Sequence, residues 1–150
     1  MNATFLPELI TIIQAKLEQL EKKISSFEQP FLWKTQPSVL NSAGNLTLHL
    51  LGNLNYYIGA VLGQTGYIRN RENEFAAKDV PSVELLHMIR ETHLMIGEVL
   101  NSLPEVALHK NYPMLVFDKP MSSSYFLMHL SDHLAYHVGQ INYLRRILQG

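Results

Sequence analysis

The sequence contains no cysteine among its 150 residues, and this absence removes several classes of function at once. Disulfide bonds, thiolate metal sites and a cysteine nucleophile are all excluded. Charge is also nearly balanced, with 12 Lys and Arg against 13 Asp and Glu, and neither sign forms a long run. We therefore expect no electrostatic binding to nucleic acid or to an anionic membrane.

Long apolar runs and a targeting segment are missing as well. No segment approaches the ~18 uninterrupted apolar residues that a membrane span needs, so we expect no contact with the membrane interior. The first residues lack the basic region and apolar block of a signal peptide, which indicates a cytoplasmic protein. With 47% hydrophobic residues, the chain has enough apolar side chains for one globular core. We expect a single domain over residues 1–150.

Apolar residues recur at helical spacing in four segments, and no set of strands is indicated. The first seam, from Leu6 to Ile24, steps alternately by four and three residues, as helices of a bundle do. The sequence therefore predicts an all-α four-helix bundle, whose longer connectors permit long crossover connections. The predicted helices cover residues 6–24, from 41–45 to about 65, from 79–82 to about 103, and 121–149.

The fourth predicted helix carries polar side chains where a core face is expected. At about 100° per residue, His129, His133, His137 and Gln140 fall on one side of it. Histidines four residues apart can turn both rings toward one cation. The alternative is a half-exposed helix whose histidines hydrogen-bond to water, and the fourth helix alone does not decide between the two.

His49 falls on the inner face of the second predicted helix, and Asn53 follows one turn later. A lone buried histidine is more often a hydrogen-bonded core residue than a ligand. If the second and fourth helices face each other, however, His49, His133 and His137 can converge on one ion. Three neutral imidazoles suit Zn²⁺, Ni²⁺, Fe²⁺ or Cu²⁺ better than Mg²⁺ or Ca²⁺, and we expect zinc or nickel. Three protein ligands also leave a coordination position open, as catalytic sites do.

Several other polar residues are candidates for the surroundings of this site. Asn53, Tyr56, His129 and Gln140 are candidates for orienting the ligands or binding substrate. No carboxylate falls on either inner face near the histidines, which disfavours an iron site with two histidines and one carboxylate.

Three glycines of the second helix, Gly52, Gly59 and Gly63, lie together on a different side. Glycine destabilises a helix interior by about 0.5–1 kcal/mol relative to alanine, so a stripe of three indicates close approach by another group. A dimer contact or an opening to the site would explain it, but we favour tight packing within the chain.

The two longer connectors have different characters. In the charged connector over residues 66–81, Arg69 and Arg71 either meet an anionic substrate group or form local ion pairs in a solvated loop, and we favour the loop. The connector over residues 104–120 is apolar in places, and either forms a lid or covers core. We expect this second connector to shape the pocket together with Trp33, Tyr57 and Phe126.

Two segments carry a resemblance to a known family: NLTLHLLGN at residues 45–53 and MHLSDHLAYHVGQI at residues 128–141. They resemble the DinB/YfiT superfamily of four-helix-bundle metalloenzymes, and the likeness covers nearly the whole chain. The family's metal triad implies His49, His133 and His137 as ligands here. Its fourth-helix signature often reads His-xx-His-His-Arg-Gly-Gln, whereas this chain has Tyr136 and Val138 where His and Arg are common.

This resemblance implies a metal-dependent transferase or isomerase that uses a low-molecular-weight thiol such as bacillithiol or mycothiol, and a homodimer. We therefore expect a divalent-metal enzyme whose three-histidine site activates a thiol cosubstrate or water, for transfer to or hydrolysis of a small molecule. Two alternatives stay open. One is a non-catalytic bundle or dimer that a metal stabilises, and the other is a metal-free core with hydrogen-bonded histidines.

Overall fold

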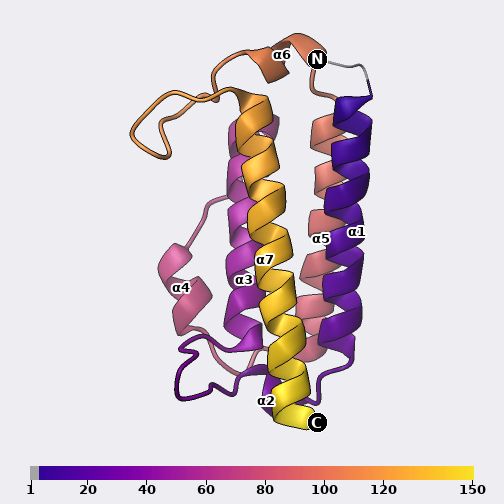
Figure 1. Ribbon diagram of the computed structural model, residues 1–150, viewed down its shortest axis with the longest axis vertical. Coiled ribbons are helices and arrows are strands. Elements are labelled where there is room, and N and C mark those ends of the chain that lie inside the picture. The colour runs from indigo at the N-terminus through magenta and orange to yellow at the C-terminus, as the bar shows by residue number, and fades with distance from the viewer. Residues whose placement is uncertain (1–3) are drawn as a thin grey trace.

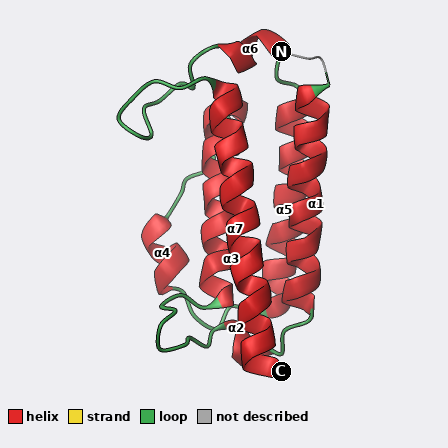
Figure 2. Cartoon of the chain, viewed as in Figure 1, coloured by secondary structure: helices red, strands yellow, loops and turns green. Residues whose placement is uncertain are grey.

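The computed structural model describes residues 4–150, in which helices joined by loops make up the fold (Figures 1 and 2). Within this range the only β pairings are two isolated bridges. The predicted all-α bundle is confirmed, while the first three residues of the expected domain lie outside the described chain. The elements are α1 (Phe5–Ser25), α2 (Gln29–Leu32), α3 (Ala43–Leu54), the π-helix η1 (Asn55–Leu62), α4 (Arg71–Ala76), α5 (Ser82–Asn101), α6 (Glu105–His109) and α7 (Ser123–Gln149).

Four long helices form the bundle: α1, α3 with its continuation η1, α5 and α7 (Figure 1). Arg90 in the first half of α5 bonds Glu21 near the end of α1, so these two helices are antiparallel. Gly63 directly after η1 lies against Val99 near the end of α5, so the second and third long helices are parallel. The chain between them must return along the bundle, and this is the long crossover that the sequence permitted.

The core lies between the inner faces of these helices. The seam predicted for α1 is buried from Ile10 to Ile24, whereas Leu6 at its beginning is only half-buried. Burying one such aliphatic side chain stabilises the fold by about 1.5–3 kcal/mol. Among the described residues, no helix combines the length and apolar character that crossing a membrane requires.

The second long helix changes its winding at Asn55, which the sequence pattern did not predict. There α3 passes into η1, a π-helix with i→i+5 hydrogen bonds. The Asn55 side-chain amide donates to the carbonyl of Leu51 and to the hydroxyl of Thr92, both at 2.8 Å. The wider turn rotates all later residues relative to a 3.6-residue helix, so inner-face assignments beyond Asn55 cannot be carried over from α-helical spacing.

The charged connector contains a short helix, α4, where a loop was expected. The side chain of Asn70 caps this helix by accepting a hydrogen bond from the Asn73 backbone N–H at 3.0 Å. Asn45 of α3 then ties the segment down, because its amide donates to the carbonyls of Glu74 at 3.0 Å and Ala77 at 2.8 Å. The connector is therefore docked on α3 through its backbone, although most of its side chains are exposed, and in Figure 1 α4 lies on the outer side of α3.

The glycine stripe serves contacts within the chain. A Cβ on Gly52 would overlap with the carboxyl group of Glu74, and one on Gly63 would press against Val99 of α5. Both close approaches are intramolecular, in agreement with the favoured interpretation.

Candidate metal centre

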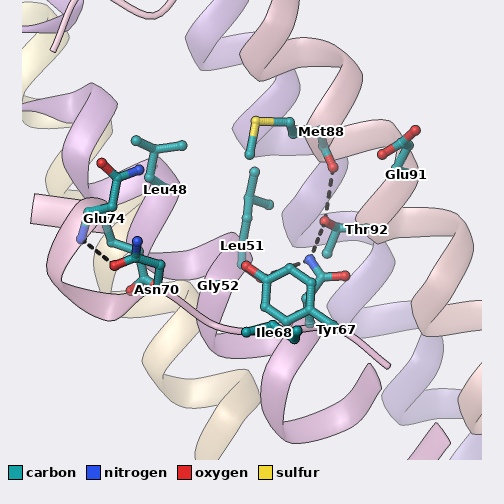
Figure 3. Close-up of a pocket in the computed structure, with 12 residues that line it drawn as sticks. Leu48, Leu51, Gly52, Tyr67, Ile68, Asn70, Glu74, Met88, Glu91 and Thr92 are labelled. Carbon is teal, nitrogen blue, oxygen red and sulfur yellow. Dashed lines mark hydrogen bonds between the residues drawn. The ribbon is translucent and has the colours of Figure 1, made fainter. Parts of the chain in front are cut away.

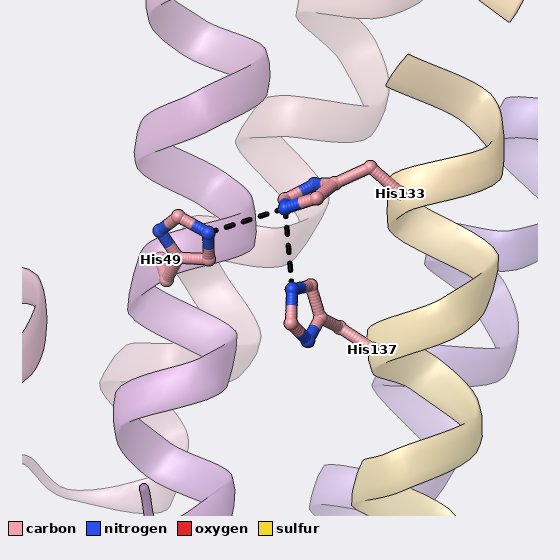
Figure 4. Close-up of side chains that lie close together, drawn as sticks. All are labelled: His49, His133 and His137. Carbon is pink, nitrogen blue, oxygen red and sulfur yellow. Dashed lines mark hydrogen bonds between the residues drawn. The ribbon is translucent and has the colours of Figure 1, made fainter. Parts of the chain in front are cut away.

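Three histidines from two facing helices meet in the bundle. His49 projects from α3, and His133 and His137 project from α7 (Figure 4). The Nε2 atom of His133 lies 3.3 Å from that of His49 and 3.2 Å from that of His137. Ligand atoms from the three residues all fall within 4.8 Å of one another, so the group could hold a metal ion. The structure thus brings together the three residues that the sequence singled out.

Local sequence explains why the rings meet. On α7 the two histidines are four residues apart and therefore share one face. Ser122 caps the start of this helix by accepting a hydrogen bond from the backbone N–H of Tyr125 at 3.1 Å, and buried leucines beside the histidines, Leu130 and Leu134, hold the face inward.

His49 is held by a buried carboxylate from the connector. Its Nδ1 lies 3.1 Å from Oε1 of Glu74, a residue that is only 5% exposed. An ionised carboxylate can only accept, so Nδ1 carries the proton and donates it to Glu74, which leaves the Nε2 lone pair facing the other histidines. Arg69 donates to both oxygens of Glu74, from Nε at 2.8 Å and from Nη2 at 2.9 Å. Arg69 therefore offsets the carboxylate's charge.

His137 is oriented in the same way by an amide. Its Nδ1 lies 2.6 Å from Oε1 of Gln140, one turn further along α7. The amide oxygen accepts the Nδ1 proton, so the Nε2 of His137 also presents a lone pair to the centre. Metal-binding histidines are commonly fixed by a hydrogen bond to the other ring nitrogen. Glu74 and Gln140 make this contact for two of the three rings.

His133 lies between the other two rings and cannot satisfy both. Two Nε2 lone pairs face it, and a proton on its own Nε2 can serve only one of them. Burial, followed by the proximity of His137 and His49, lowers the pKa of His133 to about 4. Burial also lowers the pKa of His49, although Glu74 opposes the shift. Protonation is disfavoured, and a cation bound by all three lone pairs fits this donor set.

A cavity of about 360 Å³ opens beside the histidines. It extends from His49 and His133 to Val116 and Phe117, so the connector before α7 forms part of the cavity wall. The lining residues are His49, Asn53, Tyr57, Arg69, Arg71, Val116, Phe117, Phe126, His129, Leu130 and His133.

Two of the remaining candidates lie in this cavity. Asn53 is buried, and its Oδ1 has no hydrogen-bond partner within the described chain. His129 stacks on Phe126 with ring centroids 5.9 Å apart, and its ring centre lies 6.5 Å from that of His133. His129 therefore lines the cavity without joining the triad.

Two other candidates lie outside this cavity. The hydroxyl of Tyr56 points to the sulfur of Met114 at 3.9 Å, and Tyr56 does not line the cavity. Tyr56 lies just inside the π-helix, where α-helical spacing misplaces a side chain. Trp33 does not shape the cavity either, because its ring packs on Gly44 at the opposite end of α3.

A second cavity, of about 260 Å³, lies against a different face of α3 (Figure 3). Leu48, Leu51 and Gly52 contribute to its wall, together with Thr92 from α5. None of the three triad histidines lines it. Glu74 stands at its edge, and the carboxyl group occupies the space that the absent Gly52 side chain leaves.

Glu74 is the site residue that sequence reasoning missed. It lies in the charged connector, outside the helices whose inner faces were searched for carboxylates. The available indication was Gly52, three residues after His49: a glycine beside a ligand implies that another group approaches there. That group is the carboxylate that holds His49.

Comparison with known proteins places the chain in a family. A family model described as "Protein of unknown function (DUF1572)" matches residues 1–150. No curated protein matches the chain. A solved structure, "Crystal structure of the conserved protein of locus from Enterococcus faecalis", is similar with a TM-score of 0.75 and 18% sequence identity, over 97% of this chain and 96% of that one. At this identity the likeness shows a shared fold alone. The family model's match to residues 1–150 shows that the chain belongs to the DUF1572 family.

Proposed function

We propose that this protein is a divalent-metal enzyme in which His49, His133 and His137 bind zinc or nickel. The observation that carries the proposal is the convergence of three Nε2 atoms, two of them on rings whose Nδ1 atoms are held by Glu74 and Gln140. Neutral imidazoles suit these metals. Three protein ligands leave a position for an exogenous group, and the adjoining cavity gives that group access.

The reaction that we propose is activation of a thiol cosubstrate or water for attack on a small electrophile. The bound ion would lower the pKa of a coordinated thiol or water, so that a nucleophile forms near neutral pH. Asn53 lines the cavity, and its side-chain amide would form a hydrogen bond to the reacting group and orient it. Because Arg69 offsets the charge of Glu74, the protein adds no net negative charge that would weaken the ion's effect.

The sequence resemblance supports a thiol over water. The segments at residues 45–53 and 128–141 resemble the DinB/YfiT superfamily, in which thiol-dependent transferases and isomerases occur. The chain has no cysteine, which fits a thiol brought in as a cosubstrate but does not require one. The same resemblance supports a small-molecule substrate.

Metal analysis tests the proposal. Untagged protein purified without chelator would be analysed by mass spectrometry, as the parent and as His133→Ala and His129→Ala variants. We expect about one zinc or nickel ion per chain in the parent and in the His129 variant, which keeps the triad, and none in the His133 variant. Full occupancy in His133→Ala, or an empty parent that cannot be reconstituted, would refute the site.

Turnover separates an enzyme from a bundle that a metal only stabilises. The metal-loaded parent would be assayed with low-molecular-weight thiols against small electrophiles, and with esters and amides for hydrolysis. We expect turnover that disappears in His133→Ala. Full metal occupancy without turnover in any assay would favour the stabilising role, in which case chelation would still lower the melting temperature.

A further inference from the structure

The charges around the cavity are of one sign. Arg69 and Arg71 line it, and no aspartate or glutamate does. Arg69 is already engaged, because both oxygens of the buried Glu74 accept its hydrogen bonds. Arg71 differs: it forms no ion pair within the described chain. Its guanidinium stands over the ring of Phe75 at 5.7 Å from the ring centre, a contact that leaves its hydrogen-bond donors available.

The rest of the cavity wall combines apolar and aromatic side chains with polar ones. Tyr57, Phe126 and Leu130 from the bundle face Val116 and Phe117 from the covering connector. A volume of about 360 Å³ lies within the range of small-molecule sites, in which apolar walls hold the body of a ligand and a few polar groups fix its orientation. Here the polar groups include His49 and His133 of the triad, Asn53 and the free guanidinium.

We propose that the molecule taken into this cavity carries a carboxylate or phosphate group that Arg71 binds, together with an apolar or aromatic body. This inference rests on the proposed function for the reacting end of the molecule and adds a second point of recognition. A guanidinium presents paired N–H donors that match two oxygens of one oxyanion. Neither the imidazole ligands nor the Arg69–Glu74 pair adds net negative charge, so beside the ion site the cavity favours an anionic small molecule over a cationic one.

Binding of matched probes tests the inference. The protein as isolated would be titrated with 3-phenylpropanoate, with its uncharged amide, and with 2-phenylethyl phosphate. We expect the parent to bind at least one of the two anions about tenfold or more tightly than the amide. The stronger of the two anions then identifies which oxyanion the site prefers.

Two variants locate the source of that preference. Arg71→Gln is expected to bind anion and amide alike while keeping the parent's affinity for the amide, because only the charged contact is removed. Arg146→Gln is the control, since Arg146 also stands over an aromatic ring, that of Tyr143 at 5.8 Å, but does not line the cavity. It is expected to retain the full preference.

The outcomes distinguish this inference from the proposed function. Equal affinity for anions and amide in the parent would overturn it, and so would a preference that survives in Arg71→Gln, because the anion would then bind elsewhere, including at the ion. Metal content is measured separately in each protein. A parent that cannot be loaded with metal but still shows the Arg71-dependent preference would sustain the anion site and refute the metal enzyme.

Discussion

Replacing Glu74 with glutamine tests whether the connector controls the metal centre. The change conserves shape but removes the charge and one acceptor. Glu74 now accepts from His49 at 3.1 Å and from two nitrogens of Arg69 at 2.8 and 2.9 Å. Glutamine offers one acceptor oxygen, and its NH₂ group would face a donor whichever way the amide turns. Either His49 or Arg69 therefore loses its partner.

The expected magnitude follows from these contacts. Loss of the partner that orients a metal-binding histidine typically weakens metal binding by about 10–100-fold, which corresponds to about 1.4–2.7 kcal/mol. If Arg69 is the group left unpaired instead, its buried donors lose their acceptor at about 1–3 kcal/mol of folding stability. We expect the loss in metal affinity in either case, because the carboxylate also supplies the charge that strengthens the His49 bond.

Competition against a chelator of known affinity would give the zinc dissociation constant of the parent and of Glu74→Gln. Glu18→Gln provides a matched control, because Glu18 bonds His93 at a similar 3.2 Å but is exposed and distant from the triad. We expect the control to bind zinc as the parent does. If Glu74→Gln stayed within about twofold of the parent, the carboxylate would not orient His49 and the account of the site given above would be wrong.

Two further predictions use the same structure. Gly52→Ala should also weaken zinc binding, because the new Cβ would overlap with the carboxyl group of Glu74 and push it away from His49. Gly139→Ala on α7 is the control and should leave zinc affinity unchanged, since a Cβ there would meet no neighbouring group within 4 Å. Equal zinc affinities for the two variants would contradict this prediction. In chelated protein, urea denaturation should show the free energy of unfolding falling as the pH drops from about 6.5 toward 4. The folded-state pKa of His133 is about 4 against 6.5 for a free imidazole, so the unfolded chain takes up the proton first; His49 acts in the same direction. The loss due to His133 is at most about 3 kcal/mol, reduced by solvent screening. His133→Gln should flatten this slope, and a parent stability independent of pH over that window would show that His133 is not buried in a neutral form.

The bundle was largely predictable because helical periodicity is a local property. The spacing of apolar residues was enough to predict the helical seam that ends at Ile24. The same spacing, with a capping residue, predicted the long helix that begins after Ser122. The π-helix at Asn55 was not predictable in this way, because apolar spacing does not report the hydrogen bond from that side chain to Thr92 on another helix. Tyr56, which follows directly, lies outside the cavity, whereas Tyr57 lines it as expected.

The candidate site was predictable to the extent that regular helices carry it. His49, His133 and His137 lie on inner faces that helical geometry defines, and Gln140 lies one turn from its partner. Glu74 reaches the site through a connector, whose path depends on tertiary contacts. Sequence periodicity does not report such contacts, so it indicated the three candidate ligands but not the Glu74 carboxylate that holds His49.

Helix α3 links the connector to the candidate metal centre through residues about one turn apart. Asn45 donates hydrogen bonds to the connector's backbone at Glu74 and Ala77. The Glu74 side chain orients His49 through a hydrogen bond, and Gly52 leaves the space in which that carboxyl group lies. Binding of an ion to His49 therefore favours the docked connector, and docking favours the ion by the same free energy, since linkage is reciprocal. Because Arg71 belongs to the same connector, the metal centre and the proposed anion contact should assemble together rather than independently.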